Sequence, residues 1–323
     1  MAEDDHSFKY DESDEKGPGH WGDLKPAWQT CKTGKFQSPI DLKTNNGVAV
    51  AEADSRVSLE GLKRSYKEAP AVMMNRGHDI VVQWEGDAGG IVVNGTHYKL
   101  VQCHWHSPSE HTINGQRLKM ELHMVHNSSE GQLAVVAVLY EFGHPDKFLS
   151  KVFNLIELLL YMNKNENEKG IELGNVNPWT VQLGSRKYFR YMGSLTVPPC
   201  TEGVVWTIVD KIRTVSREQS RALALSVHHG FENNSRPTQQ IDGRSVQLYR
   251  PQCMMMSCCV SGGGGGNGVG SGKSDKGGGD CGGGGEGRAV GLRGVVVATA
   301  VDDKEEDGGS DGGGNGDLEM EKQ

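Results

Sequence analysis

The feature that most constrains this chain is a set of three histidines spaced like ligands of one metal ion on neighbouring β-strands. His104 and His106 are two residues apart in the run QCHWH, and His123 follows in ELHMV. Alternate side chains of a strand point to the same face, so both imidazoles of the H-x-H pair point one way. Three neutral imidazoles leave the fourth position of a tetrahedral zinc ion open for water. The spacing predicts a zinc site of the hydrolytic or hydratase kind, and the alternative is a half-buried, histidine-rich hairpin.

Two polar residues beside these histidines favour the metal site. Gln102 and Glu121 each lie two residues before a histidine, so on a strand they face the same side as that histidine. A metal-binding imidazole needs an acceptor for its other nitrogen, and a buried polar group without a partner is costly. We therefore predict that Gln102 and Glu121 support His104 and His123. The alternative is that both belong to a solvent-facing strand surface.

Short apolar segments rich in β-branched residues, separated by turn residues, predict a mainly β fold. We expect strands over residues 80–84, 91–93, 100–106, 119–126 and 133–140, with turns such as Asn94-Gly95 and Asn114-Gly115 between them. A 3.6-residue period predicts a helix over residues 148–162. Ser216, with Gln219 three residues later, forms a capping-box pattern that opens a second helix ending near Ser226. A mainly antiparallel sheet with a few peripheral helices follows.

The composition changes after Pro251. Just over half of the chain's 45 glycines lie beyond residue 260. A segment of this kind cannot bury enough apolar surface to offset the entropy lost on ordering. We expect one domain over residues 6–251 and a disordered, glycine-rich tail over residues 252–323. The tail cysteines match no zinc module by their spacing: Cys253, Cys258, Cys259 and Cys281.

The sequence around the histidines resembles the alpha class of carbonic anhydrases, most closely their plant members. The matching segments, in chain order, are QSPID (37–41), NRGH (75–78), HWHSPSEHTING (104–115), ELHMVH (121–126), SLTVPPCTE (194–202) and NSRP (234–237). The resemblance covers residues 6–251. It implies a large, twisted, mostly antiparallel sheet with Zn2+ at the base of a cone-shaped cleft. It also implies a lyase activity, the reversible hydration of carbon dioxide to bicarbonate and a proton by attack of zinc-bound hydroxide.

The resemblance implies roles for four residues around the metal. Thr196 would accept the hydrogen of the hydroxide and donate its own to Glu110, which orients the nucleophile. His78 would relay protons to buffer, because an imidazole titrates near neutral pH. Tyr10 would belong to the solvent network between the metal and His78. Without the resemblance, Thr196 is an ordinary loop threonine, Glu110 a surface carboxylate and His78 a surface histidine after a turn glycine.

Carbon dioxide is apolar and needs an apolar wall beside the metal. The resemblance assigns this wall to residues that could equally be core packing: Val125, Val135, Leu195, Val204 and Trp206. Val197 follows Thr196 where other members carry Thr or His, so we expect altered anion affinity and rate without loss of activity. His111 and Tyr191 match buried polar residues behind Glu121.

The resemblance also implies a disulfide between Cys31 and Cys200, and the alternative is two free buried thiols. Three N-x-S/T sequons, at Asn94, Asn127 and Asn233, fit a glycoprotein. A disulfide implies the secretory pathway or another oxidising compartment, extracellular or chloroplast. No signal peptide is visible in the acidic first residues. Either the sequence lacks its leader, or the protein is cytosolic and the disulfide does not form.

The formal net charge of -8 argues against nucleic acid or an anionic membrane as partner. No apolar run is long enough to span a bilayer. The implied partner is a small molecule, carbon dioxide or bicarbonate, and the sequence sets no oligomeric state. The alternative to an active enzyme is a catalytically reduced relative that serves as a storage or binding protein. Such relatives typically lose a zinc histidine, whereas this chain keeps His104, His106 and His123.

Overall fold

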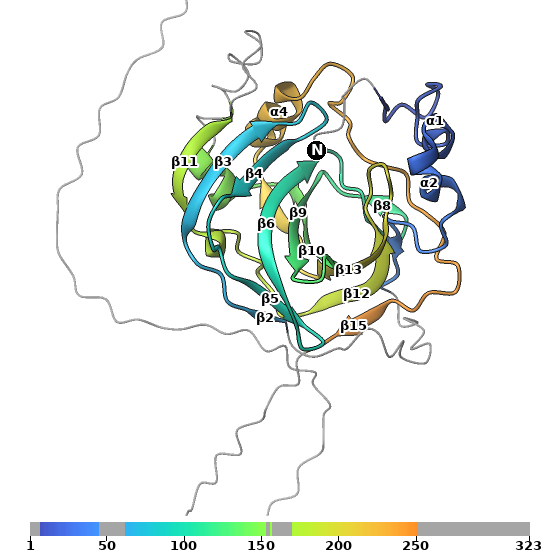
Figure 1. The fold of residues 1–323 in the computed structure, drawn as a ribbon. Helices are drawn as coiled ribbons and strands as arrows, with labels where there is room; N and C mark the ends of the chain where they lie inside the picture. The colour runs from blue at the N-terminus through green and yellow to red at the C-terminus, as the bar shows by residue number, and fades with distance from the viewer. Residues whose placement is uncertain (1–6, 45–61, 153–155, 157–169, 251–323) are drawn as a thin grey trace, which may run out of the picture. The chain divides into compact units, whose positions relative to one another are not determined.

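The computed structural model describes residues 7–44, 62–152, 156 and 170–250, and twelve strands within these residues form one twisted sheet (Figure 1). In chain order these strands are β2 (Lys63–Arg64), β3 (Ala69–Asn75), β4 (Ile80–Trp84), β5 (Gly90–Val93), β6 (Thr96–His106), β9 (Met120–Ser128), β10 (Leu133–Phe142), β11 (Ile171–Val176), β12 (Tyr188–Ser194), β13 (Glu202–Val209), β14 (Arg213–Val215) and β15 (Gln247–Tyr249).

The spatial order of the main path is β11-β3-β4-β6-β9-β10-β13-β12-β15, with β5 joining β2 to β6 and with β14 beside β10. Every pair in this sheet is antiparallel except β10 with β13 and β10 with β14. The predicted mainly β, mostly antiparallel fold is confirmed. The five predicted strands correspond to β4, β5, β6, β9 and β10, with ends that differ by a few residues.

Both faces of the sheet carry apolar side chains, and the central strand β10 alternates between them. Its even-numbered residues Ala134, Val136, Val138 and Tyr140 pack in the larger core. Its odd-numbered residues Val135, Ala137 and Leu139 pack in a second core on the opposite face. A strand buried on both faces reads as a continuous apolar run, which is how residues 133–140 read in the sequence.

An extra residue in β6 forms a β-bulge in its pairing with β9. Leu100 lies opposite His126, whereas Gln102 lies opposite Val125, so Val101 has no partner of its own. A bulge of this kind changes the face to which the following side chains point. Val101 is 37% exposed, as expected for a residue pushed out of the ladder.

The bulge determines which way the histidines face. Even-numbered residues before it and odd-numbered residues after it pack in the same core: Tyr98, Leu100, Cys103 and Trp105. A side-chain period of two cannot produce this pattern without an extra residue. His104 and His106 therefore lie on the face opposite that core, together with Gln102.

Smaller elements surround the sheet in the described part of the chain. The helical ones are α1 (Trp21–Leu24), η1 (Pro26–Trp28), α2 (Thr30–Thr33), η3 (Pro178–Thr180) and α4 (Arg217–Ser226), and a small second sheet contains β1 (Asp41–Leu42), β7 (Thr112–Ile113) and β8 (Gln116–Arg117). The predicted helix at Ser216 is confirmed: the Ser216 hydroxyl accepts from Gln219 N, and the Gln219 side chain accepts from Ser216 N.

Two predictions concern segments that lie partly or wholly outside the described residues. The predicted helix over residues 148–162 is helical at 148–152 and at 156, and its remainder lies outside the described residues. The predicted tail over residues 252–323 also lies outside them, as does residue 6 at the start of the predicted domain. No helix in the described part of the chain is long and apolar enough to cross a membrane.

Deleting Val101 should force the side chains in one half of β6 to point to the opposite face of the sheet. Either Tyr98 and Leu100 or Cys103 and Trp105 would leave the core, so we expect the free energy of unfolding to fall by roughly 3–6 kcal/mol. The matched control is Val101→Ala, which keeps the bulge and should change stability by less than about 1 kcal/mol. Urea unfolding measures both, and equal midpoints would contradict the role given to the bulge.

Candidate metal centre

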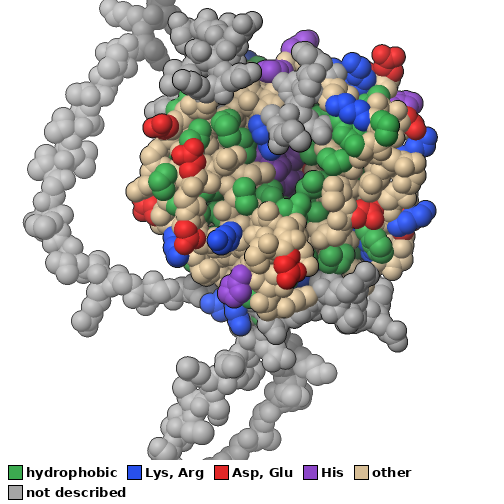
Figure 2. Space-filling view, viewed as in Figure 1, with side chains coloured by type: hydrophobic (Ala, Val, Ile, Leu, Met, Phe, Trp, Pro, Cys, Tyr) green, Lys and Arg blue, Asp and Glu red, His purple; other side chains and the backbone are tan. Residues whose placement is uncertain are grey.

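His104 and His106 on β6 and His123 on β9 meet on one face of the sheet. The strand register places His104 directly opposite His123. One nitrogen of each ring lies within 4.8 Å of the corresponding nitrogens of the others. Figure 2 shows histidine side chains at the bottom of a hollow, with hydrophobic side chains beside them. The three predicted ligands are therefore gathered at one place.

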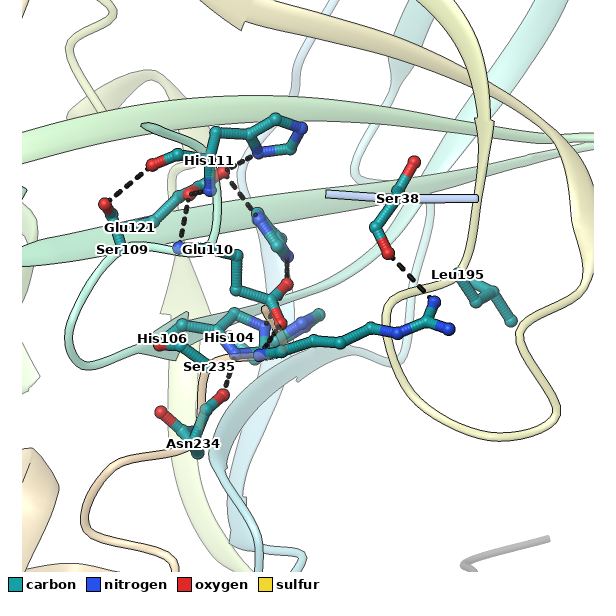
Figure 3. Close-up of polar contacts among 12 residues, drawn as sticks. Ser38, His104, His106, Ser109, Glu110, His111, Glu121, Leu195, Asn234 and Ser235 are labelled. Carbon is teal, nitrogen blue, oxygen red and sulfur yellow. Dashed lines mark hydrogen bonds and ion pairs between the residues drawn. The ribbon is translucent and has the colours of Figure 1, made fainter. Parts of the chain in front are cut away.

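The outer nitrogen of each ring is hydrogen bonded to an oxygen. The pairs are His104 Nδ1 with Gln102 Oε1 at 2.9 Å, His106 Nδ1 with the Asn234 carbonyl at 2.6 Å, and His123 Nε2 with Glu121 Oε1 at 2.8 Å. Figure 3 shows the His106 pair. Carbonyl and carboxylate oxygens only accept, so each outer nitrogen donates its hydrogen. Each inner nitrogen of a neutral ring is then left with a lone pair that can bind a metal ion.

Two buried atoms at the centre have no hydrogen-bond partner within the described residues, His106 Nε2 and Glu110 Oε2. They lie 3.5 Å apart, and Glu110 Oε2 is 4.0 Å from His123 Nδ1. Removal from water lowers the pKa of His104 and of His123, which favours the neutral rings that metal binding requires. Convergent imidazole lone pairs beside a carboxylate oxygen suit a cation, and the donor set fits zinc.

The buried carboxylate of Glu121 connects the centre to the loop behind it. Its Oε1 accepts from His123 Nε2 at 2.8 Å and from His111 Nδ1 at 2.6 Å. Its Oε2 accepts from the backbone N–H groups of Glu110 at 2.9 Å and His111 at 2.8 Å. Burial acts to raise the pKa of Glu121, but His111 and His123 hold it well below its usual value. Glu121 is therefore ionised and fixes the orientation of His123.

A directed row of hydrogen bonds continues from Glu121 to the N-terminal part of the chain. Because His111 Nδ1 donates to Glu121, its Nε2 accepts from the Tyr191 hydroxyl at 2.8 Å. The Tyr191 hydroxyl in turn accepts from Ser38 Oγ at 2.8 Å, and Ser38 Oγ accepts from Ser194 N at 3.0 Å. Burial raises the pKa of Tyr191, so its hydroxyl keeps its hydrogen. Sequence reasoning placed His111 and Tyr191 behind Glu121 but gave Ser38 no role.

Arg236 holds Glu110 from the other side. Its backbone N–H donates to Glu110 Oε1 at 2.9 Å. Its buried guanidinium donates to Gln37 Oε1 and the Ser38 carbonyl, both at 2.9 Å, and to the Cys31 carbonyl at 3.0 Å. Burial lowers the pKa of Arg236 to about 10, although the Glu110 charge opposes this. Arg236 therefore joins the N-terminal segment to the metal centre.

Thr196 lies in the loop between β12 and β13, which a disulfide anchors. The predicted bond between Cys31 and Cys200 is present, and Gln37 Nε2 donates to the Cys200 carbonyl at 3.1 Å. Thr196 is buried, and in the described residues it forms no hydrogen bond to Glu110. The predicted contact between them is thus not made, and their roles stay predictions.

His78 lies in the turn between β3 and β4, where Gly77 has a φ of 83°. The His78 ring packs against Phe8, with ring centroids 5.5 Å apart. Tyr10 is also buried, and its pKa is raised first by burial and then by the charges of Glu110 and Asp79. The Tyr10 ring also packs against Phe8, with ring centroids 5.6 Å apart, so Tyr10 and His78 share one aromatic neighbour.

Asn234 connects that turn with a metal-site histidine. Its amide nitrogen donates to the carbonyls of His78 at 2.9 Å and Trp105 at 3.1 Å. The backbone carbonyl of Asn234 accepts from His106 Nδ1. Sequence reasoning gave no role to Asn234 or Arg236, although both lie in the NSRP segment already matched to the family. That segment was the available signal, but which group each contacts depends on the fold.

The predicted apolar wall lies largely in the core on the metal-site face. Val135, Val204 and Trp206 are buried there, and Val125 and Leu195 are partly buried against them. The Trp206 ring lies 4.8 Å from the His123 ring, so this core reaches the metal centre. Val197 instead packs against the N-terminal aromatic cluster that contains Phe8 and Tyr10.

A family model and the similar proteins of known sequence all indicate the same protein family. A family model described as eukaryotic-type carbonic anhydrase matches residues 16–250. The chain is 50% identical over 250 residues to alpha carbonic anhydrase 4 of Arabidopsis thaliana, covering 77% of this chain and 88% of that protein. It is 46% identical over 252 residues to carbonic anhydrase Nec1 of Nesocodon mauritianus, covering 77% and 87%.

Two solved structures have similar folds. A dioscorin complexed with ascorbate matches with a TM-score of 0.68 and 39% identity, covering 76% of this chain and 99% of that chain. An alpha-carbonic anhydrase from Thermovibrio ammonificans, in complex with the inhibitor sulfanilamide, matches with a TM-score of 0.62 and 33% identity, covering 74% and 97%.

The substitution Glu121→Gln should weaken zinc binding by about 10–100-fold. An amide has only one accepting oxygen, so at least one donor of His111, His123 or the backbone would face an NH2 group. Competition with a chelator of known affinity measures the change. Glu85→Gln, at an exposed position after β4, is the control and should bind zinc like the wild type. Equal affinities of the two variants would mean that Glu121 does not support His123.

Proposed function

The chain belongs to the eukaryotic-type carbonic anhydrase family, and on that premise we propose that it catalyses the reversible hydration of carbon dioxide to bicarbonate and a proton. The observation that carries the proposal is the convergence of His104 Nε2, His106 Nε2 and His123 Nδ1, each on a ring whose other nitrogen is hydrogen bonded to an oxygen. These three nitrogens would hold zinc. Zinc, when bound, lowers the pKa of water to about 7 and so supplies a hydroxide nucleophile at neutral pH.

Thr196 and Glu110 would orient that nucleophile. Glu110 Oε1 is already occupied by the Arg236 backbone, so Oε2 is the oxygen available to accept from the Thr196 hydroxyl. If the Thr196 hydrogen is committed to Glu110, Thr196 Oγ1 can only accept from the nucleophile. That one-way arrangement holds the nucleophile's hydrogen away from the substrate carbon and its lone pair toward it.

The apolar wall would receive carbon dioxide beside the metal. Val135, Val204 and Trp206 offer no hydrogen-bonding side chain to the hollow except the Trp206 indole, whose Nε1 is committed to the Ser194 carbonyl at 3.0 Å. A wall of this kind accepts an apolar molecule and holds a bicarbonate ion weakly, which favours product release.

His78 would carry the proton away from the centre. Its backbone is fixed to the metal site through Asn234, which also accepts from His106. Tyr10, whose ring packs against the same Phe8 ring as His78, would order the solvent along this route. An imidazole suits the task because its ordinary pKa lies close to neutral pH.

We also propose that the protein works in an oxidising compartment, as a glycoprotein. Cys31 and Cys200 are joined, and such bonds persist outside the reducing cytosol. All three sequon asparagines, Asn94, Asn127 and Asn233, are exposed, so a glycan could be attached without unfolding the chain.

The alternative is a binding or storage protein with reduced catalysis. The observation that supports this alternative is the similarity of the chain to the dioscorin structure, which is complexed with ascorbate. The intact set of three histidines with Glu110 and Thr196 favours the enzyme.

Zinc-loaded full-length protein should hydrate carbon dioxide in a stopped-flow assay, and a sulfonamide should inhibit it. His123→Ala should lose zinc and fall to the rate of buffer alone, because two imidazoles no longer define the site. Circular dichroism and unfolding curves check that both proteins are folded. A folded, zinc-bound wild type without activity would exclude the enzyme and favour the binding or storage alternative.

His78→Ala should slow hydration in weak buffer by about ten- to a hundredfold, and added imidazole should restore the rate. The reason is that proton release, rather than attack on carbon dioxide, becomes limiting. His144→Ala, which removes an exposed histidine elsewhere, is the matched control and should leave the rate unchanged. A rate unaffected by His78→Ala would show that protons leave by another route.

A further inference from the structure

A second cavity, of about 450 Å³, lies between β2, the segment leading into β12, and β15. Figure 1 shows β2 and β15 at the same end of the sheet. The strand register gives its separation from the metal centre. Lys63 of β2 pairs with Val92, and Val92 pairs with His97 near the start of β6. From residue 97 to residue 104 is seven residues, or about 23 Å along a strand, so the β2 side of the cavity lies far from the metal centre. None of the metal-centre residues lines the cavity.

The cavity is lined by four cationic side chains, Lys63, Arg64, Arg186 and Lys187. Within the described residues, none of the four forms an ion pair with a carboxylate. Four cations without a carboxylate partner among the described residues are unexpected in a chain whose net charge is -8. Burial lowers the pKa of Arg64, and the charge of Arg186 lowers it further. An anion in the cavity would relieve this repulsion.

One wall of the cavity is an exposed tryptophan held in a fixed position. Trp179 is 43% exposed, yet its Nε1 donates to the Tyr66 carbonyl at 3.0 Å and its ring packs edge-on against Tyr66 at 5.5 Å. The Arg64 guanidinium carbon lies 4.6 Å from the centre of the Trp179 ring. A planar cation stacked on a planar ring gives a surface that suits flat, anionic ligands.

Another part of the wall is a pair of stacked tyrosines, of which Tyr188 is almost fully buried. Tyr188 on β12 and Tyr249 on β15 are register partners, and their rings lie 4.8 Å apart with an interplanar angle of 16°. Since both rings belong to paired strands, this wall is formed before any ligand arrives. The cavity thus combines aromatic and cationic side chains, and pockets of this composition fix a ligand by a few polar contacts and enclose its apolar body.

We propose that this cavity binds a small aromatic anion, such as an aryl phosphate or an aromatic carboxylate. The acidic group would lie among Arg64, Arg186 and the two lysines, where guanidinium groups can bind it through paired hydrogen bonds. The ring would pack against Trp179 and Tyr249, since Tyr188 is almost fully buried. The proposal does not depend on the catalytic function, because no residue of the metal centre takes part.

Isothermal titration of the full-length, zinc-loaded protein with 1-naphthyl phosphate tests the proposal. We expect the double variant Arg64→Gln/Arg186→Gln to weaken binding by about tenfold or more, because charge-assisted hydrogen bonds are lost. Arg221→Gln, which removes an exposed arginine of α4, is the matched control and should bind like the wild type. The second double variant Lys63→Gln/Lys187→Gln, at exposed positions, should also weaken binding and guards against misfolding of the first.

Two further ligands separate the contributions of charge and ring. Neutral 1-naphthol and inorganic phosphate should each bind more weakly than 1-naphthyl phosphate. Equal binding of inorganic phosphate would reduce the cavity to a general anion site and overturn the proposal. Loss of 1-naphthyl phosphate binding in His123→Ala would place the ligand at the metal centre and overturn it as well. Unchanged affinity for 1-naphthyl phosphate in both double variants would also overturn the proposal.

Discussion

A carboxylate removed from water needs donors to stabilise its charge, and Glu121 receives hydrogen bonds from two imidazoles and two backbone N–H groups. Each donor is thereby fixed in turn. His123 has its lone pair directed inward, the backbone at Glu110 and His111 is held, and His111 must accept from Tyr191. Removing such an acceptor would leave buried donors unpaired, at about 1–3 kcal/mol for each. The metal centre and its supporting loops therefore form one cooperative unit around a single charge.

This unit joins parts of the chain that are far apart in sequence. Ser38 contacts Tyr191 and Ser194, and Arg236 contacts Cys31, Gln37 and Ser38. The bond between Cys31 and Cys200 closes a separation of 169 residues in the same region. Cross-links over such long loops restrict the unfolded chain strongly. The loop that carries Thr196 is thus held by covalent and polar contacts rather than by a regular element of its own.

Features with local causes could be predicted from the sequence. The alternation around His104 and His123, the apolar run of β10 and the capping box at Ser216 depend only on neighbouring residues. The bulge at Val101 could not be predicted, because it appears only when β6 is paired with β9. Nor could the contacts of Ser38, Asn234 and Arg236, since each crosses more than a hundred residues. Family resemblance indicated those segments, but not which atom meets which.

The arrangement of acceptors at the metal centre is unfavourable in free energy, and the surrounding structure offsets this cost. Three inward lone pairs and Glu110 Oε2 all accept, and none can satisfy another. In a low-dielectric interior this crowding of acceptors is unfavourable unless a cation or a donor lies among them. Side chains free to rotate would turn away, and here every ring is held by a hydrogen bond on its outer side. The outer hydrogen bonds therefore do more than set tautomers: they maintain a geometry that the centre alone would not keep, and affinity for a metal ion follows from that constraint.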